Sequence, residues 1–219
     1  MIADMKKHAQ FLTDAQLAAE ISRCEYCQEK PCKKACPADC SPADFIMAAK
    51  RGEKSDFRRA AALILGNNPL GGVCGAVCPD KFCMKACARS GIDSPVNIPA
   101  VQATLVQKAK ELGVLPLFIK SEPNGRKIAV IGAGPAGVSA AAVLAQKGYK
   151  VDIFDSYGAV GGMCNLIPDF RLDKSVLATD LDFIRSLGDI NLETDCAVQK
   201  PSELLAKGYC AVIAACGLA

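Results

Sequence analysis

Nine of the 13 cysteines in this 219-residue chain lie between Cys24 and Cys87, in two blocks. The first block begins at Cys24 and has the spacing Cys-x2-Cys-x4-Cys-x3-Cys-Pro. The second begins at Cys74 and has the spacing Cys-x3-Cys-Pro-x3-Cys-x3-Cys. Thiolates spaced this closely can converge on a metal centre from short loops and helix starts. The first part of the chain is therefore expected to fold around its cysteines.

The residues alone leave three interpretations of these blocks open: iron–sulfur clusters, zinc sites, and inert or redox-active thiols. Zinc sites usually pair one Cys-x2-Cys with another, and only Cys24 and Cys27 have that form. Disulfides are disfavoured because the cysteine count is odd and the first 20 residues lack the apolar core of a signal peptide. The spacing favours iron–sulfur clusters over zinc.

Composition narrows the functional classes. Hydrophobic residues make up 51% and charged residues 22% of the chain, which argues against a disordered protein. The net charge of +3 is too small to indicate a nucleic-acid partner. No run of about 18 apolar residues occurs, so we expect no membrane partner and a cytoplasmic location. With a single histidine, His8, we expect no His-based catalysis and assign no catalytic residue.

The local pattern changes near residue 122, where turn residues at 121–125 indicate a linker. Before it, caps and apolar periodicity predict helices only; after it, short β-type runs alternate with helices, which is typical of a parallel, doubly wound sheet. We expect a helical domain over residues 1–122 and a Rossmann-type domain over 123–219. The predicted helices cover residues 13–22, 42–52, 55–65, 97–112, 136–147 and 176–187, and the predicted strands cover 127–131, 150–154 and 209–215.

A glycine-rich turn follows the first predicted strand. Its strand, G-x-G-x-x-G and helix arrangement predicts a dinucleotide site, in which the glycines allow a tight turn, close approach of the pyrophosphate and helix–strand packing. Asp155, at the end of the second strand, is suited to accept a ribose hydroxyl, and Asp152 is the alternative acid. The expected contacts in the turn are Gly132, Gly134, Pro135, Ala136 and Gly137.

The segments around the cysteines resemble a known family. The runs RCEYCQEKPCKKACP from Arg23, NPLGGVCGAVCP from Asn68 and PVNI from Pro95, with Gln102, are similar to the N-terminal iron–sulfur and FAD half of dihydropyrimidine dehydrogenase. The resemblance is strongest to the separate bacterial NAD(P)H-oxidising subunit and weaker to the glutamate synthase small subunit. It implies an α-helical, ferredoxin-like domain with two clusters, followed by a partial α/β Rossmann-type FAD-binding domain.

The resemblance also implies two [4Fe–4S] clusters with crossed ligands. Cluster one would be held by Cys24, Cys27, Cys32 and Cys87. Cluster two would be held by Cys36, Cys78, Cys83 and Gln102, the last being a neutral donor that changes cluster charge and potential. Cys74 and Cys40 are left over as structural thiols, with Cys40 as a less favoured substitute for Cys36.

By the same resemblance, FAD is the expected dinucleotide. Its further contacts would be Gly161, Gly162, Met163, Arg171 and Ala197. Gly-Gly-x-Cys also begins the dithiol of disulfide reductases, but the position of the partner cysteine is held by Asp169. Cys164 is therefore predicted to be a packing residue.

The implied function is electron transfer within an NAD(P)H-dependent oxidoreductase. Electrons would pass from FAD through two clusters to an FMN-containing catalytic subunit or domain that reduces a pyrimidine or similar substrate. The sequence has no second glycine fingerprint, so NAD(P)H is expected to bind only in a complete enzyme, which could be a homo- or hetero-oligomer. The alternatives are a non-enzymatic electron-transfer module of a split complex, electron input of the glutamate synthase small-subunit type, and a zinc-stabilised interaction protein.

Overall fold

The computed structural model describes residues 11–217, and its contacts divide the chain into two units. The first unit comprises the residues up to Pro116 together with Pro168–Val176. The second comprises Leu117–Ile167 and the residues from Leu177 onward. Each unit is described by itself.

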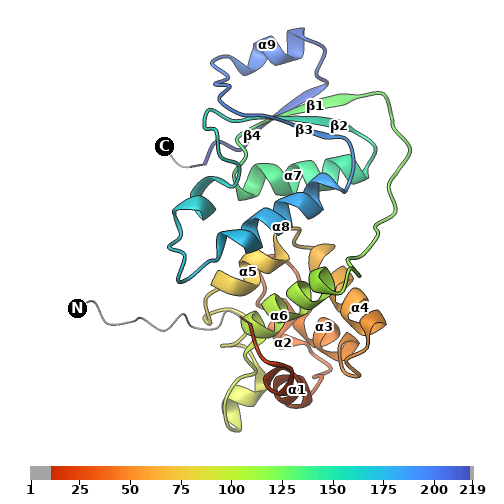
Figure 1. The fold of residues 1–219 in the computed structure, drawn as a ribbon, viewed down its shortest axis with the longest axis vertical. Helices are drawn as coiled ribbons and strands as arrows, with labels where there is room; N and C mark the ends of the chain where they lie inside the picture. Colours follow the sequence, from red (N-terminus) through yellow and green to blue (C-terminus); the bar gives the residue numbers. More distant parts are fainter. Residues whose placement is uncertain (1–10, 218–219) are drawn as a thin grey trace, which may run out of the picture. The chain divides into compact units, whose positions relative to one another are not determined.

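The described part of the first unit is helical between residues 14 and 111, without strands (Figure 1). Two helix starts predicted from their caps are confirmed: the Thr13 hydroxyl accepts from the Gln16 N–H, and the Asn97 side chain accepts from the Ala100 N–H. The helices of the first unit up to residue 111 are α1 (Asp14–Ser22), α2 (Pro31–Lys34), α3 (Pro42–Ala48), α4 (Lys54–Leu65), α5 (Gly71–Val77), the 3-10 helix η1 (Ala88–Gly91) and α6 (Ile98–Glu111).

Other predicted bounds in this unit are wrong by a few residues. The helix after Ser41 ends at Ala48, short of the predicted Gly52. The next helix begins at Lys54, with Glu53 in place of Ser55 at its N-cap, and the Asp56 carboxylate accepts from the Glu53 N–H at 3.4 Å. The short helices α2 and α5 were not predicted.

Helix α6 forms the centre of the helical unit. Its residues Val101, Leu105 and Val106 are fully buried, and α5 packs closely along it. A Cβ atom at Gly75 of α5 would lie 2.5 Å from the backbone nitrogen of Ala103 on α6. The glycine therefore lets the two backbones approach each other.

The second unit contains the predicted parallel sheet. Its strands are β1 (Lys127–Ile131), β2 (Lys150–Phe154), β3 (Ile190–Glu193) and β4 (Ala211–Ala214), in the order β3-β2-β1-β4. All three strand pairs are parallel. Helices α7 (Pro135–Gln146) and α8 (Lys174–Arg185) lie on one face of the sheet, and α9 (Pro201–Ala206) lies on the other (Figure 1).

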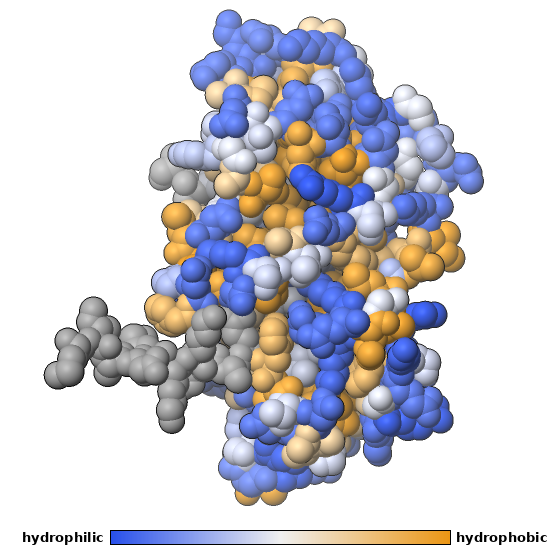
Figure 2. Space-filling view, viewed as in Figure 1, coloured by the Kyte–Doolittle hydropathy of each residue, from blue (hydrophilic) through white to orange (hydrophobic). Residues whose placement is uncertain are grey.

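Both predicted N-terminal strands of this sheet are confirmed at their predicted bounds, whereas β4 is shorter than predicted and α8 begins two residues earlier. The face of the molecule seen in Figure 2 mixes hydrophilic and apolar residues. No helix within residues 11–217 is long and apolar enough to cross a membrane.

The close approach of α5 to α6 gives a stability test. Gly75→Ala should lower the free energy of unfolding by about 1–3 kcal/mol, because the added methyl group would meet backbone atoms that cannot move aside easily. Gly91→Ala is the matched control, since a Cβ there meets nothing within 4 Å. Urea unfolding of both variants measures the effect, and equal midpoints for them would contradict the packing described.

Candidate functional site

Four cysteine thiols from two separate segments of the first unit surround one cavity. Cys24 and Cys27 lie in the loop after α1, Cys32 lies in α2, and Cys87 directly precedes η1. All four line the same cavity, whose remaining wall is partly apolar and includes Ile46 of α3. The structure thus brings together the four residues assigned by resemblance to cluster one.

Burial disfavours ionisation of two of these thiols. It raises the pKa of the Cys24 and Cys32 thiols, and the neighbouring Cys87 thiol raises both further by charge repulsion. Four thiolates in such a cavity need a positive centre to offset their charge, and a bound metal deprotonates its thiol ligands outright. The chemistry of the four donors therefore fits a metal–sulfur centre.

The second group of predicted ligands lies at the ends of α2 and α5. Cys36 follows α2, Cys78 directly follows α5, and Cys83 is buried in the turn beyond it. Burial raises the pKa of Cys83 to about 12, with further contributions from Cys78 and Cys36. These mutual contributions indicate that the three thiols lie near one another.

Gln102 lies on α6, the helix that packs against α5. Its amide nitrogen Nε2 donates to the carbonyl oxygen of Gly71 at 2.8 Å. Because that nitrogen is engaged with the backbone, only the oxygen Oε1 is suited to bind a metal. The hydrogen bond fixes the orientation of the amide that the resemblance assigns to cluster two.

The two leftover thiols of the cysteine blocks have other partners. Cys40 is 1% exposed, and its Sγ donates to the carbonyl oxygen of Ile64 at 3.8 Å. Burial raises the pKa of Cys40 to about 12, and the neighbouring Cys36 also contributes. Cys74 donates to the side-chain oxygen of Asn68 at 3.7 Å. The structural role predicted for both thiols stays a prediction.

Across residues 11–217, no group of three or more His, Cys, Asp or Glu side chains is arranged to hold a single metal ion. The four thiols of the first group are instead arranged around a cavity.

The second unit presents the glycine turn between β1 and α7. Gly132 has a φ of +106°, and a Cβ there would lie 2.3 Å from the carbonyl oxygen of Ala215. A Cβ at Gly137 would lie 1.9 Å from the carbonyl oxygen of Gly132. At Gly134 the nearest atom would be 3.9 Å away, so this glycine is not required by packing within the protein. An open backbone there suits a bound pyrophosphate at the start of α7.

The second glycine pair packs on this turn. Gly161 donates its N–H to the carbonyl oxygen of Ala133 at 2.9 Å. A Cβ at Gly162 would lie 2.9 Å from the Cα of Gly134. Met163 follows in the 3-10 helix η2 (Gly162–Leu166) with its side chain 71% exposed. These residues gather at the carboxyl end of β1, where parallel sheets bind dinucleotides.

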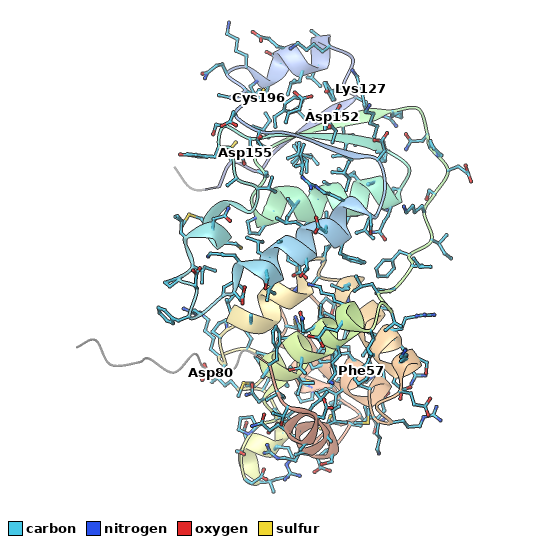
Figure 3. The ribbon with its side chains drawn as sticks, viewed as in Figure 1. Phe57, Asp80, Lys127, Asp152, Asp155 and Cys196 are labelled. Carbon is cyan, nitrogen blue, oxygen red and sulfur yellow. The ribbon has the colours of Figure 1, made fainter. Side chains whose placement is uncertain are left out.

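Asp155 ties the end of β2 to the turn. Its carboxylate accepts from the Ala133 N–H at 2.6 Å and from the Tyr157 N–H at 2.9 Å. Figure 3 shows Asp155 and Cys196 toward one end of the sheet and Lys127 toward the other. Ala197, which follows Cys196, is exposed beside this end. Asp155 thus holds the glycine turn, a role that its predicted contact with ribose did not include.

Asp152, the alternative acid, is engaged elsewhere. It is 6% exposed, and its Oδ2 accepts from the hydroxyl of Tyr209 at 2.8 Å. Lys127 lies over the Tyr209 ring at 4.4 Å. The carboxylate and burial together raise the pKa of Tyr209 to about 12. Asp152 therefore stabilises the middle of the sheet.

Arg171 belongs to the first unit, whereas the glycine turn belongs to the second. Its guanidinium donates to the carbonyl oxygen of Val77 at 3.3 Å, at the carboxyl end of α5 and next to Cys78. Residues 168–176 belong to the first unit. Pro135 and Ala136 are exposed in the first turn of α7. The flavin contact assigned to Arg171 stays a prediction.

Two charged residues beside the first cavity were missed by the sequence analysis. Glu25 and Arg89 line the same cavity as the four thiols, and they form an ion pair at 2.6 Å. The only signal in the sequence is that each lies within two positions of a predicted ligand, Cys24 or Cys87.

Comparisons with known proteins match both units. Residues 1–114 match the family described as dihydropyrimidine dehydrogenase domain II, 4Fe-4S cluster, and residues 130–179 match the NAD(P)-binding Rossmann-like domain. The chain is 39% identical over 181 residues to the NAD-dependent dihydropyrimidine dehydrogenase subunit PreT of Salmonella typhimurium, covering 82% of this chain and 43% of the relative.

Two further relatives have other names. The putative oxidoreductase UacF of Escherichia coli is 35% identical over 190 residues, covering 85% of this chain and 29% of the relative. The glutamate synthase [NADPH] small chain of Escherichia coli is 31% identical over 208 residues, covering 94% of this chain and 43% of the relative. The chain thus spans less than half the length of these relatives.

The first match covers more than half of the chain and includes every predicted cluster ligand, and the second includes the glycine turn. The chain belongs to the family of the 4Fe-4S domain II of dihydropyrimidine dehydrogenase, and this domain is followed by a Rossmann-like domain.

Proposed function

We propose that this chain is the electron-transfer portion of an NAD(P)H-dependent oxidoreductase that uses FAD and two [4Fe–4S] clusters. The observation that carries the proposal is the gathering of Cys24, Cys27, Cys32 and Cys87 around one cavity. Three of these residues come from the first cysteine block and the fourth from the end of the second. A zinc site built from neighbouring pairs would not require this crossed arrangement.

When bound, FAD would exchange electrons in pairs and the clusters would carry them one at a time. The chain's own residues would bind and tune these groups. Ile46, Val96 and Ile98 line the first cavity beside the thiols. Apolar walls limit water around a cluster and so affect its potential.

The second ligand set would be Cys36, Cys78, Cys83 and the Oε1 atom of Gln102. The hydrogen bond from Gln102 to Gly71 supports this assignment, because it holds the amide in a fixed orientation. Because a neutral oxygen donor replaces a thiolate, the second ligand set carries one negative charge fewer than the first. That difference would separate the potentials of the two clusters.

FAD would bind at the carboxyl end of β1 and β2. Gly132 and Gly137 shape the turn, and the open backbone at Gly134 would receive the pyrophosphate at the amino end of α7. Asp155 would accept a hydrogen bond from a ribose hydroxyl. Its carboxylate has lone pairs available for this in addition to the two that accept from backbone N–H groups. Gly161, Gly162, Met163 and Ala197 lie at the same end of the sheet. The flavin contact of Arg171, a residue of the first unit, is proposed from the resemblance alone.

The partner would be an FMN-containing catalytic subunit or domain that reduces a pyrimidine or a similar substrate. The support is the identity of 38–39% to subunits named for dihydropyrimidine dehydrogenase, against 31% to the glutamate synthase small chain. These relatives are themselves named as subunits or chains of larger enzymes.

The cluster content is tested on anaerobically purified protein. We expect about eight iron atoms and eight acid-labile sulfides per chain, as two [4Fe–4S] clusters require. Gln102→Ala should alter the electron paramagnetic resonance spectrum of one reduced cluster and shift its potential, because one ligand is lost. Gln107→Ala is the matched control on the same helix, since that side chain bonds only to Glu111 in the described structure.

Two outcomes would count against this assignment. Zinc without labile sulfide in the wild-type protein would overturn the clusters. Identical spectra for the Gln102 and Gln107 variants would remove Gln102 from the ligands.

The flavin site is tested by two glycine substitutions in one turn. Gly134→Ala should weaken FAD binding at least about tenfold with little change in stability, because its methyl group would occupy the space for the pyrophosphate. Gly137→Ala should lower both binding and stability, since its methyl group would meet the Gly132 carbonyl at 1.9 Å. Flavin titration and thermal unfolding measure the two effects, and unchanged affinity in Gly134→Ala would refute this placement of FAD.

A further inference from the structure

Arg89 connects two carboxylates beside the first thiol cavity. Its Nη1 donates to Oε1 of Glu25 at 2.6 Å. Its Nη2 donates to Oδ2 of Asp93 at 2.5 Å, and its Nε donates to Oδ1 of the same carboxylate at 3.1 Å. The contact with Asp93 is therefore bidentate, which is the strongest geometry for an arginine–carboxylate pair.

A second arginine extends this network to α1 and α6. Arg23 pairs with Glu20 at 3.0 Å and with Asp93 at 3.6 Å, and it donates to the side-chain oxygen of Ser94 at 2.7 Å. The other oxygen of Glu20 accepts from the N–H of Asn97, the cap of α6, at 2.8 Å. The charged network is therefore anchored to two helices of the unit.

The network joins the two chain segments that carry the outermost thiols of the cavity. Arg23 and Glu25 flank Cys24, and Arg89 lies two residues after Cys87. Glu25 and Arg89 line the cavity themselves. Cys24 and Cys87 are more than 60 residues apart in the chain, so closing this loop has a considerable entropic cost.

Within the described residues, the segment that follows Cys87 is otherwise held by the hydrogen bond from the Ser90 hydroxyl to the carbonyl oxygen of Met84 at 3.3 Å and by short-range backbone hydrogen bonds. The 3-10 helix η1 has four residues and no side-chain cap, and such a short element is not stable by itself. The Arg89 side chain is only 20% exposed. Its guanidinium also holds the pKa of the Asp93 carboxyl well below its usual range, so the pair stays charged in mild acid.

We propose that Arg89 is a positioning residue that holds Cys87 against Cys24 by bridging Glu25 and Asp93, and so closes the crossed ligand set of cluster one. This inference rests on the proposed function, because it assigns a role in assembling one of its two clusters. Arg89 does not bind the iron itself. It acts through Cys87, the ligand supplied by the second cysteine block.

The test is Arg89→Met in the anaerobically purified chain, with Arg58→Met as the matched control. Methionine keeps much of the apolar stem but removes the guanidinium, and Arg58 is exposed on α4, away from both cysteine blocks in the sequence. We expect Arg89→Met to lose cluster one selectively, with iron falling from about eight to about four atoms per chain. Where cluster one is retained, a chelator should remove its iron at least about tenfold faster.

The remaining cluster is identified by adding Gln102→Ala, which should change its resonance spectrum. Arg89→Lys should restore cluster one in part, because lysine can pair with one carboxylate but cannot form the bidentate contact. Glu25→Gln should produce a smaller loss of cluster-one iron than Arg89→Met. In the double variant, Glu25→Gln should cause less additional loss than it does alone, because both substitutions break the same ion pair.

The outcomes separate this inference from the proposed function. A wild-type protein without labile sulfide overturns the clusters themselves. A wild-type protein with two clusters, together with Arg89→Met that keeps eight irons and the wild-type rate of chelation, overturns the role of Arg89. Equal loss of both clusters in Arg89→Met, with loss of helical circular dichroism, would show a general folding defect and would also overturn it.

Discussion

Four thiols that share one partly apolar cavity repel each other when they ionise, and burial makes ionisation of Cys24 and Cys32 less favourable still. Without a positive centre, the arrangement of Cys24, Cys27, Cys32 and Cys87 would gain nothing from bringing these charges together. A bound metal centre reverses this balance, because it stabilises every thiolate that it contacts. The helical unit is consistent with such dependence: α2 has four residues, and α3 and α5 have seven each. Helices this short are stable only through what they pack against.

The glycine turn of the second unit is held by contacts within the protein. Glycine is required at positions 132 and 137, because a Cβ atom at either position would overlap with a backbone carbonyl oxygen of the protein. The carboxylate of Asp155 further fixes the turn through the N–H of Ala133. The turn is therefore shaped by the protein's own packing, and binding a dinucleotide should need little rearrangement.

Much of this arrangement could be predicted from sequence because its causes are local. Thr13 and Asn97 cap helices through hydrogen bonds to residues three positions away, and β1 and β2 are short apolar runs next to a glycine turn. Helix α5 could not be predicted, since three of its seven residues are glycines with poor helix propensity. It forms because Gly75 allows contact with α6, which is a tertiary effect. The hydrogen bond from the Ala133 N–H to Asp155 and the pairing of Glu25 with Arg89 were missed for the same reason, since each joins residues far apart in the sequence.

The proposed crossed ligand pattern would place a particular demand on the polypeptide. A cluster held by one block needs only a local loop, whereas a ligand from the second block must be brought back across more than 60 residues. Helices α3 to α5 fill that interval, and α6 packs against α4 and α5. Packing of these helices brings the two blocks to the same region, and the segment after Cys87 is exposed. Directional hydrogen bonds from Arg23 and Arg89 can fix such a segment, because a guanidinium donates at several defined angles. In this unit, apolar packing brings the two blocks together and charge-assisted hydrogen bonds set the position of the last thiol.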